Sequence, residues 1–87
     1  MIYLVKVEMN IKELESELIK RRVNPLTYSL TGGLPSDALC IEKENNKWNI
    51  YYSERGNKDY LQSFTDESEA CKFFLDTILE DSSVIMK

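Results

Sequence analysis

The side chains best suited to catalysis or metal binding are scarce in this sequence. It contains no histidine and two cysteines, Cys40 and Cys71. Without histidine there is no Ser-His or Cys-His nucleophile pair and no histidine-ligated metal, and two cysteines cannot supply a tetrahedral zinc site. Both cysteines fall on periodic apolar positions, so we expect buried free thiols. These residues predict no enzymatic activity, no cofactor and no metal.

Paired carboxylates are the remaining groups that could exchange protons with a substrate. Glu42 and Glu44 precede one predicted turn, and Glu54 and Asp59 flank the next. General acid–base catalysis also requires a cleft that holds the substrate, whereas acids beside turns usually serve solvation. We therefore expect no catalysis from these pairs.

Acidic residues and a tyrosine instead form a candidate binding surface. Its members are Glu42, Glu44, Tyr51, Glu54 and Asp59 along the predicted sheet, and Glu69, Asp76 and Glu80 on the last predicted helix. Such a surface can steer a basic protein into contact, with Tyr51 as the central anchor after docking. An ordinary solvated face is the competing interpretation, and on the residues alone it has the greater weight.

Length and charge limit the classes of protein that fit. With 87 residues, 43% apolar and 30% charged, the chain is expected to fold as one globular domain with a modest core. The net charge of −4 disfavours nucleic acid as a direct ligand and suits a basic protein partner. No apolar run approaches the roughly 20 residues of a membrane span, and no signal peptide is recognisable, so a cytoplasmic location is expected.

Two helices are predicted, and the second of them carries the acids Glu69, Asp76 and Glu80. Asn10 and Asp66 are candidate N-caps, each followed three residues later by a glutamate. The first helix is expected from Ile11 to about Arg22, and the second begins at about Glu67. The apolar stripe of the first helix comprises Ile11, Leu14, Leu18 and Ile19. The polar ridge of the second comprises Glu69, Lys72, Asp76 and Glu80.

The sheet is predicted around the stretch from Lys47 to Gly56. This stretch contains the only tryptophan and two of the five tyrosines, which favours a central strand. Asn45-Asn46 is expected to form a two-residue hairpin turn with the strand before it. The core-facing pairs would be Leu39 with Tyr52, Ile41 with Ile50 and Lys43 with Trp48. The opposite face would pair Cys40 with Tyr51 and Glu42 with Asn49, as a mixed polar surface.

Four further segments complete the prediction for the sheet. The return strand after Gly56-Asn57 has two registers: Tyr52 faces Leu61 after a two-residue loop, or Tyr60 after a three-residue loop that also sets Ile50 against Gln62. A further strand is expected over residues 26–31. The segment from Ile2 to Val7 alternates like a short strand, and the tail from Ser82 either frays or joins the sheet.

These elements predict an α+β fold: an antiparallel sheet of four to five strands in a meander of hairpins, with two helices packed mainly on one face. Residues 1–87 form a single domain in this scheme. Residues 1–8 are a candidate appended edge strand, residues 9–81 the core, and residues 82–87 a C-terminal tail.

Several short motifs together resemble small bacterial immunity proteins of polymorphic-toxin and contact-dependent growth inhibition systems. The motifs are Asn24-Pro25, Tyr28 to Pro35, Trp48 to Gly56 and Ser68 to Cys71, within a similarity from about Met9 to Glu80. The resemblance implies a cytoplasmic protein that neutralises a cognate toxin domain, often a nuclease, by blocking its basic cleft. It carries over no catalytic residues, because an inhibitor has none.

Two rival functions remain at this point. One is a regulatory or adaptor module that binds another protein, either as a monomer or as a homodimer through the Ile2–Val7 strand. The other is a small-ligand or catalytic domain, which would need a pocket near Trp48.

Overall fold

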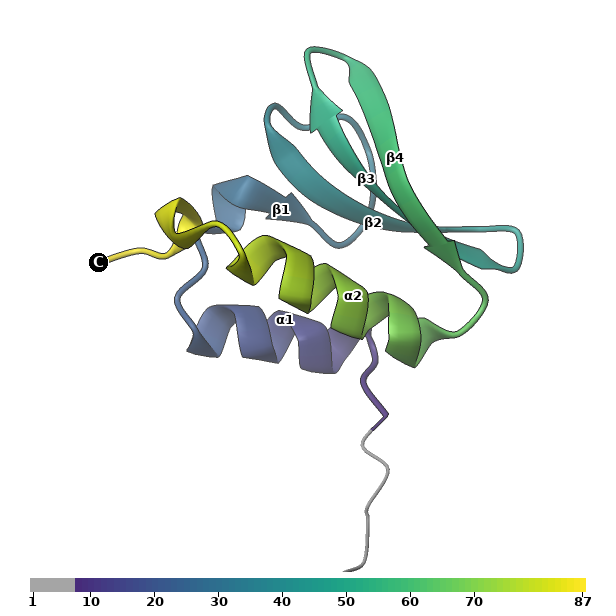
Figure 1. The fold of residues 1–87 in the computed structure, drawn as a ribbon, viewed down its shortest axis with the longest axis horizontal. Coiled ribbons are helices and arrows are strands. Elements are labelled where there is room, and N and C mark those ends of the chain that lie inside the picture. Colours follow the sequence, from purple (N-terminus) through teal and green to yellow (C-terminus); the bar gives the residue numbers. More distant parts are fainter. Residues whose placement is uncertain (1–7) are drawn as a thin grey trace, which may run out of the picture.

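A computed structural model describes residues 8–87 and shows a four-stranded sheet with two helices on one face (Figure 1). The elements in chain order are α1 (Ile11–Lys20), η1 (Pro25–Thr27), β1 (Tyr28–Ser29), β2 (Ala38–Glu44), β3 (Lys47–Glu54), β4 (Asn57–Phe64), α2 (Glu67–Leu79) and η2 (Ser82–Val84). The predicted α+β class is confirmed. The strand predicted from Ile2 to Val7 lies outside the described residues.

The strand order is β1-β2-β3-β4, so β3 is an interior strand, as predicted. The pairs β2–β3 and β3–β4 are antiparallel, whereas β1 runs parallel to β2. The expectation of a purely antiparallel meander is therefore wrong at this one edge. The segment from Leu30 to Asp37 is the reason, because it carries the chain back to begin β2 in the direction of β1 instead of closing a hairpin.

The strand predicted over residues 26–31 shrinks to Tyr28–Ser29. Pro25 opens a short 3-10 turn instead, and the Asn24 side chain caps it by accepting a 3.0 Å hydrogen bond from Leu26 N. The fixed φ of proline favours the first position of such a turn, so the residues directly after Pro25 belong to the turn and not to the strand.

The first hairpin has the predicted register, with Leu39 opposite Tyr52 and Ile41 opposite Ile50. The second hairpin has neither predicted register at Tyr52, which faces Asp59. Its turn is Arg55-Gly56, where both residues adopt positive φ angles of 51° and 80°, as tight hairpin turns require.

A β-bulge follows in the second hairpin. Tyr51 faces Tyr60, but the next residue toward the turn at Asn45-Asn46, Ile50, faces Gln62. Leu61 is therefore the extra residue on β4. The pairing of Ile50 with Gln62 is the one predicted for a three-residue loop. In the structure the bulge, and not the loop length, produces this pairing.

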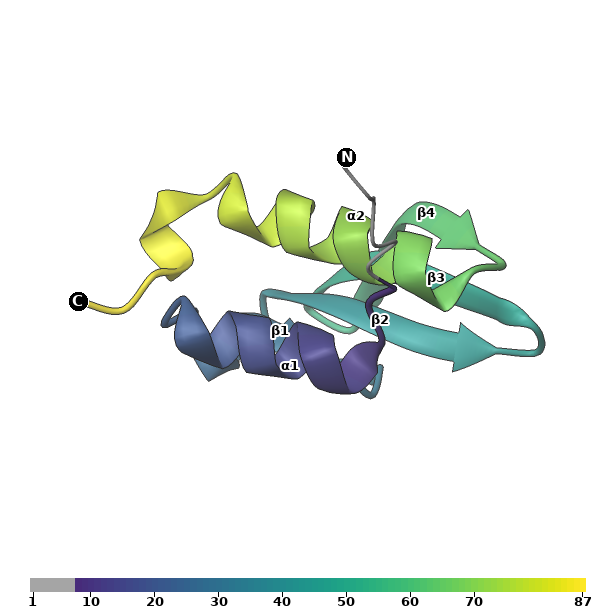
Figure 2. The ribbon, with the colours of Figure 1, turned by 90° about the horizontal axis from the view of Figure 1, so that it is seen from below.

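The two helices lie side by side and run in the same direction (Figures 1 and 2). At their N-terminal ends, Met9 N donates to Ser68 Oγ and Ile11 N donates to Glu67 Oε2, each at 3.0 Å. At the other ends, Met86 N donates to Arg22 O at 2.8 Å. The C-terminal tail thus neither frays nor joins the sheet, but pairs with the segment that leaves α1.

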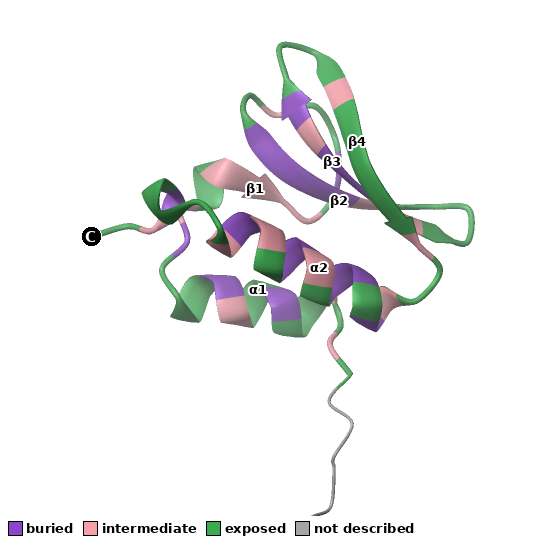
Figure 3. Ribbon diagram, viewed as in Figure 1, coloured by how far each residue is buried: buried purple, intermediate pink, exposed green. Residues whose placement is uncertain are grey.

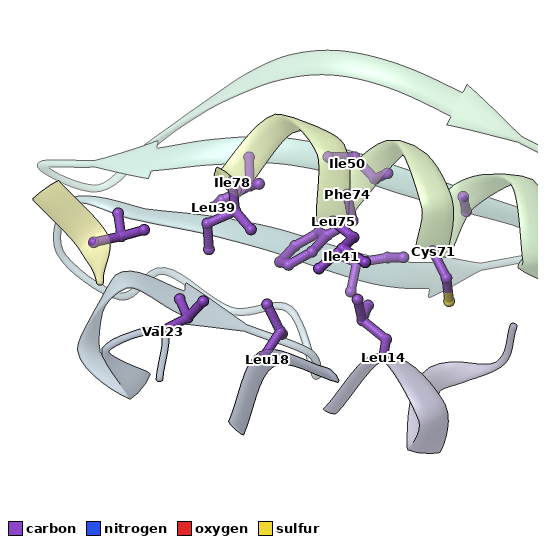
Figure 4. Close-up of a cluster of buried hydrophobic side chains, with 12 residues drawn as sticks. Leu14, Leu18, Val23, Leu39, Ile41, Ile50, Cys71, Phe74, Leu75 and Ile78 are labelled. Atoms are coloured by element: carbon purple, nitrogen blue, oxygen red, sulfur yellow. The ribbon is translucent and has the colours of Figure 1, made fainter. Parts of the chain in front are cut away.

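The main core fills the space between the helices and the sheet (Figures 3 and 4). Leu14 and Leu18 of α1 are fully buried, but Ile19 is 64% exposed, so its predicted place in the apolar stripe is wrong. The chain leaves the helix after Lys20, and Val23 occupies the core instead. The predicted polar ridge of α2 is confirmed as exposed.

Candidate functional site

A groove of about 640 Å³ opens between the sheet and the C-terminal end of α2. Its polar lining consists of Thr27, Asp37, Tyr52, Asp59, Thr77, Asp81 and Ser83. Its apolar lining consists of Leu39, Leu61, Ile78 and Val84. We call this the acidic groove, because three carboxylates line it and no described lysine or arginine does.

Local backbone features place the groove residues. Asp37 directly precedes β2 and adopts a positive φ of 51°, a conformation that aspartate tolerates better than most residues. The tight turn at Arg55-Gly56 sets Asp59 opposite Tyr52. Leu61 lies two residues after Asp59 on β4 and lines the same wall, since alternate side chains of a strand point to the same face.

Asp81 is held by the short helix that follows α2. Its carboxylate accepts hydrogen bonds from Ser83 N at 3.0 Å and from Ser83 Oγ at 2.6 Å. These bonds lower the pKa of Asp81, because they favour the charged form. The groove therefore keeps a fixed negative charge at neutral pH.

Tyr52 lies half-buried among the acids. Its pKa is raised first by burial and then by the negative charges of Asp37, Glu54 and Asp81. Its hydroxyl therefore stays protonated at neutral pH and can donate a hydrogen bond. Glu54 contributes to this pKa shift but does not line the groove.

Such a groove suits a cationic side chain. The stem of a lysine or arginine can lie on Leu39, Leu61 and Ile78 while its charged end meets a carboxylate. Within residues 8–87, no group of three or more cysteine and acidic side chains is placed to hold a metal ion. The groove offers acceptors and a tyrosine hydroxyl, which are the features of a binding site for a basic surface.

Of the eight residues predicted for the binding surface, Asp59 alone lines the groove. Glu54 does not line it, although its charge contributes to the raised pKa of Tyr52. Glu44 accepts a 3.2 Å hydrogen bond from Asn49 Nδ2 on the first hairpin. The three acids of α2, Glu69, Asp76 and Glu80, stay on the exposed ridge and are not part of the groove. The predicted acids therefore do not form one continuous site.

Tyr51 cannot be the exposed anchor that the sequence suggested, because it is 0% exposed. Its hydroxyl donates a 2.7 Å hydrogen bond to Gly33 O. The loop from Leu30 to Asp37 thus covers the outer face of the sheet, defined here by Ala38, Cys40, Glu42, Tyr51 and Ser53. The expectation of a mixed polar surface there is wrong for Cys40 and Tyr51, which are buried together with Ala38.

Glu42 lies on this outer face rather than at the groove. Its carboxylate is 3.5 Å from Lys58 Nζ, and the same ammonium lies 4.8 Å from the centre of the Tyr51 ring. Glu42 is therefore partly neutralised, which weakens its predicted role as a free acid of the interface.

Sequence reasoning missed Asp37, Tyr52 and Asp81 as site residues. Asp81 carried one usable signal, since Asp-Ser-Ser is a typical capping sequence that fixes a carboxylate. Asp37 and Tyr52 carried no such signal, because their proximity depends on how the loop before β2 lies beside β3. Trp48 does not line the groove and packs against the main core, so the pocket required by the small-ligand alternative is not the one observed here.

No protein-family model, curated protein or solved structure is significantly similar to this chain. Across residues 8–87, the helices are too short or too polar to cross a membrane.

Proposed function

We propose that this protein is an immunity protein that binds a cognate bacterial toxin domain and blocks its active cleft. The observation that carries the proposal is the acidic groove, whose lining includes Asp37, Asp59, Asp81 and Tyr52 and no described lysine or arginine. The resemblance of the sequence to small immunity proteins supports the same role. A regulatory module that binds a different basic protein is the competing use of this groove.

The proposed mechanism needs only binding. A net charge of −4 attracts a basic toxin domain at long range, and the acidic groove then receives a lysine or arginine from its cleft. The bound protein occludes the toxin's own substrate. Such a role uses no catalytic residue, cofactor or metal, and it is exercised in the cytoplasm, where the toxin would act.

Affinity capture with a matched pair of variants tests this role. Tagged protein would be used on lysate of the native host, washed at moderate and high salt, and the captured domain identified by mass spectrometry. We expect a stoichiometric basic domain that arrests growth when expressed alone, and whose effect this protein suppresses. The double variant Asp59→Asn/Asp81→Asn should bind it at least about tenfold more weakly, because the charge pairs that these two carboxylates would form with the toxin domain are lost.

The control is Asp76→Asn/Glu80→Gln, which removes the same amount of charge from the exposed ridge of α2. Asparagine at position 81 can still accept the capping hydrogen bonds, so the fold is retained. Equal binding by both double variants would contradict the groove as the interface. Capture of a housekeeping complex without toxic activity would favour the regulatory alternative.

A further inference from the structure

We infer that the partner adds an extended, lysine- or arginine-containing segment to the free edge of β4, with a basic side chain in the acidic groove. This inference rests on the proposed function, and it specifies how the same site would be occupied.

The strand β4 is an open edge of the sheet. It pairs with β3 on one side, and no strand of residues 8–87 pairs with its other side. Nearly all of β4 is exposed (Figure 3), including Tyr60 at 56% and Leu61 at 44%. An edge of this length leaves a row of backbone donors and acceptors that another extended chain can use.

One usual protection of such an edge, the bulge at Leu61, limits the regular part of β4 to the residues from Asn57 to Tyr60, and other protection of that part is sparse. A lysine on an edge strand commonly discourages pairing, and β4 contains a single lysine, Lys58, and no proline. The Lys58 ammonium is turned to the outer face, 3.5 Å from Glu42 and 4.8 Å from the Tyr51 ring centre. It is therefore held over the sheet rather than beyond its edge.

The acidic groove begins at this same edge. Its sheet-side lining passes from Asp59 and Leu61 on β4 through Tyr52 on β3 to Leu39 on β2. A segment paired with the regular part of β4 before the bulge would turn alternate side chains toward this face. One of them would lie beside Asp59, at the mouth of the groove, as in other complexes formed by strand addition.

Charge decides between a basic segment and a second copy of this chain. Pairing two copies through β4 would bring two acidic grooves, each lined by Asp37, Asp59 and Asp81, close to one another. Repulsion between these like charges would oppose association of the two copies. A segment with lysine or arginine at alternate positions gains from the same charges.

Amide hydrogen exchange followed by NMR tests the inference on the full chain. The probe is a short synthetic peptide in which lysine alternates with valine, and the control peptide has glutamate in place of lysine. At a lysine-peptide concentration ten times its Kd, alternate amides between Asn57 and Tyr60 should exchange about tenfold more slowly. Chemical shifts of Tyr52 and Leu61 should move at the same time. The variant Asp59→Asn should bind the peptide more weakly, and Asp76→Asn should not.

Three results would overturn strand addition. The first is movement of groove resonances without slower exchange on β4, which means that side chains alone dock and leaves the proposed function standing. The second is β4 protection that rises with protein concentration before any peptide is added, which means that a second copy occupies the edge. The third is the absence of any difference between the lysine and glutamate peptides.

Discussion

At the scale of single residues, one loop decides whether the side chains on the outer face of the sheet are buried or exposed. Tyr51 lies on β3 between Ile50, which is fully buried in the main core, and the half-buried Tyr52, and its own exposure depends on what covers the outer face. Gly32 and Gly33 let the loop lie close to the sheet, since both adopt positive φ angles, of 76° and 88°. The carbonyl oxygen of Gly33 then accepts a hydrogen bond from the Tyr51 hydroxyl, and Gly32 lies against the Glu42 side chain.

Replacing Gly32 by alanine should destabilise the fold by about 1–3 kcal/mol, because a side chain is strained at its positive φ and an added Cβ would collide with Glu42. The matched control is Gly56→Ala, where φ is +80° and no atom lies within 4 Å of the added Cβ. That variant carries the backbone strain without the collision and should cost less. Urea unfolding measures both, and equal losses would show that Glu42 moves aside freely.

At the scale of elements, the helix pair is joined by side chains of α2 that serve the backbone of α1. Glu67 Oε2 accepts from Ile11 N, and Ser68 Oγ accepts from Met9 N. The first amides of a helix have no partner within it. The start of α2 therefore satisfies part of the start of α1, while Asn10 accepts from Glu13 N at 2.9 Å.

Removing this bridge with Glu67→Ala should lower the free energy of unfolding by about 1–2 kcal/mol, because a hydrogen bond to a charged acceptor is lost. Glu67→Gln keeps an acceptor and should lose less. Glu69→Ala, in the same turn of α2 but exposed, should change stability by less than about 0.5 kcal/mol. Urea denaturation compares the three variants, and a Glu69 effect as large as that of Glu67 would refute the bridge.

At the scale of the whole molecule, the main core contains a thiol that resists ionisation. Cys71 is free and fully buried. Burial first, and then the charges of Glu67, Asp66 and Glu13, raise its pKa from about 9 to about 12. In the unfolded chain the thiol ionises near its usual value, so it loses its proton at lower pH than in the folded protein.

The free energy of unfolding should therefore be unaffected by Cys71 below about pH 9 and should fall above it, by about 1 kcal/mol between pH 9 and 10. Cys71→Ala should reduce stability at neutral pH but flatten this alkaline decline. Leu75→Ala, which leaves a cavity on the same helix without removing a titrating group, should keep the decline. Urea unfolding at pH 8, 9 and 10 measures the decline in each variant. If the free energy of unfolding falls as steeply with pH in Cys71→Ala as in the original protein, Cys71 is not its cause.

The sequence by itself determined the elements whose signals are local. Asn10 and Asp66 cap helices through neighbouring amides, and Asn45-Asn46 determines the register of the first hairpin. The apolar spacing of α2 identified both its core face and its polar ridge. Each of these features depends on residues a few positions apart, which composition and period reveal.

Only the tertiary structure decided which acids meet. Asp37, Asp59 and Asp81 come from the loop before β2, from β4 and from the segment after α2, and no spacing in the chain relates them. The burial of Tyr51 and the parallel pairing of β1 likewise depend on the path of one loop over the outer face. Long-range packing places these residues, because contacts between distant segments are selected by the free energy of the whole fold and not by local preference.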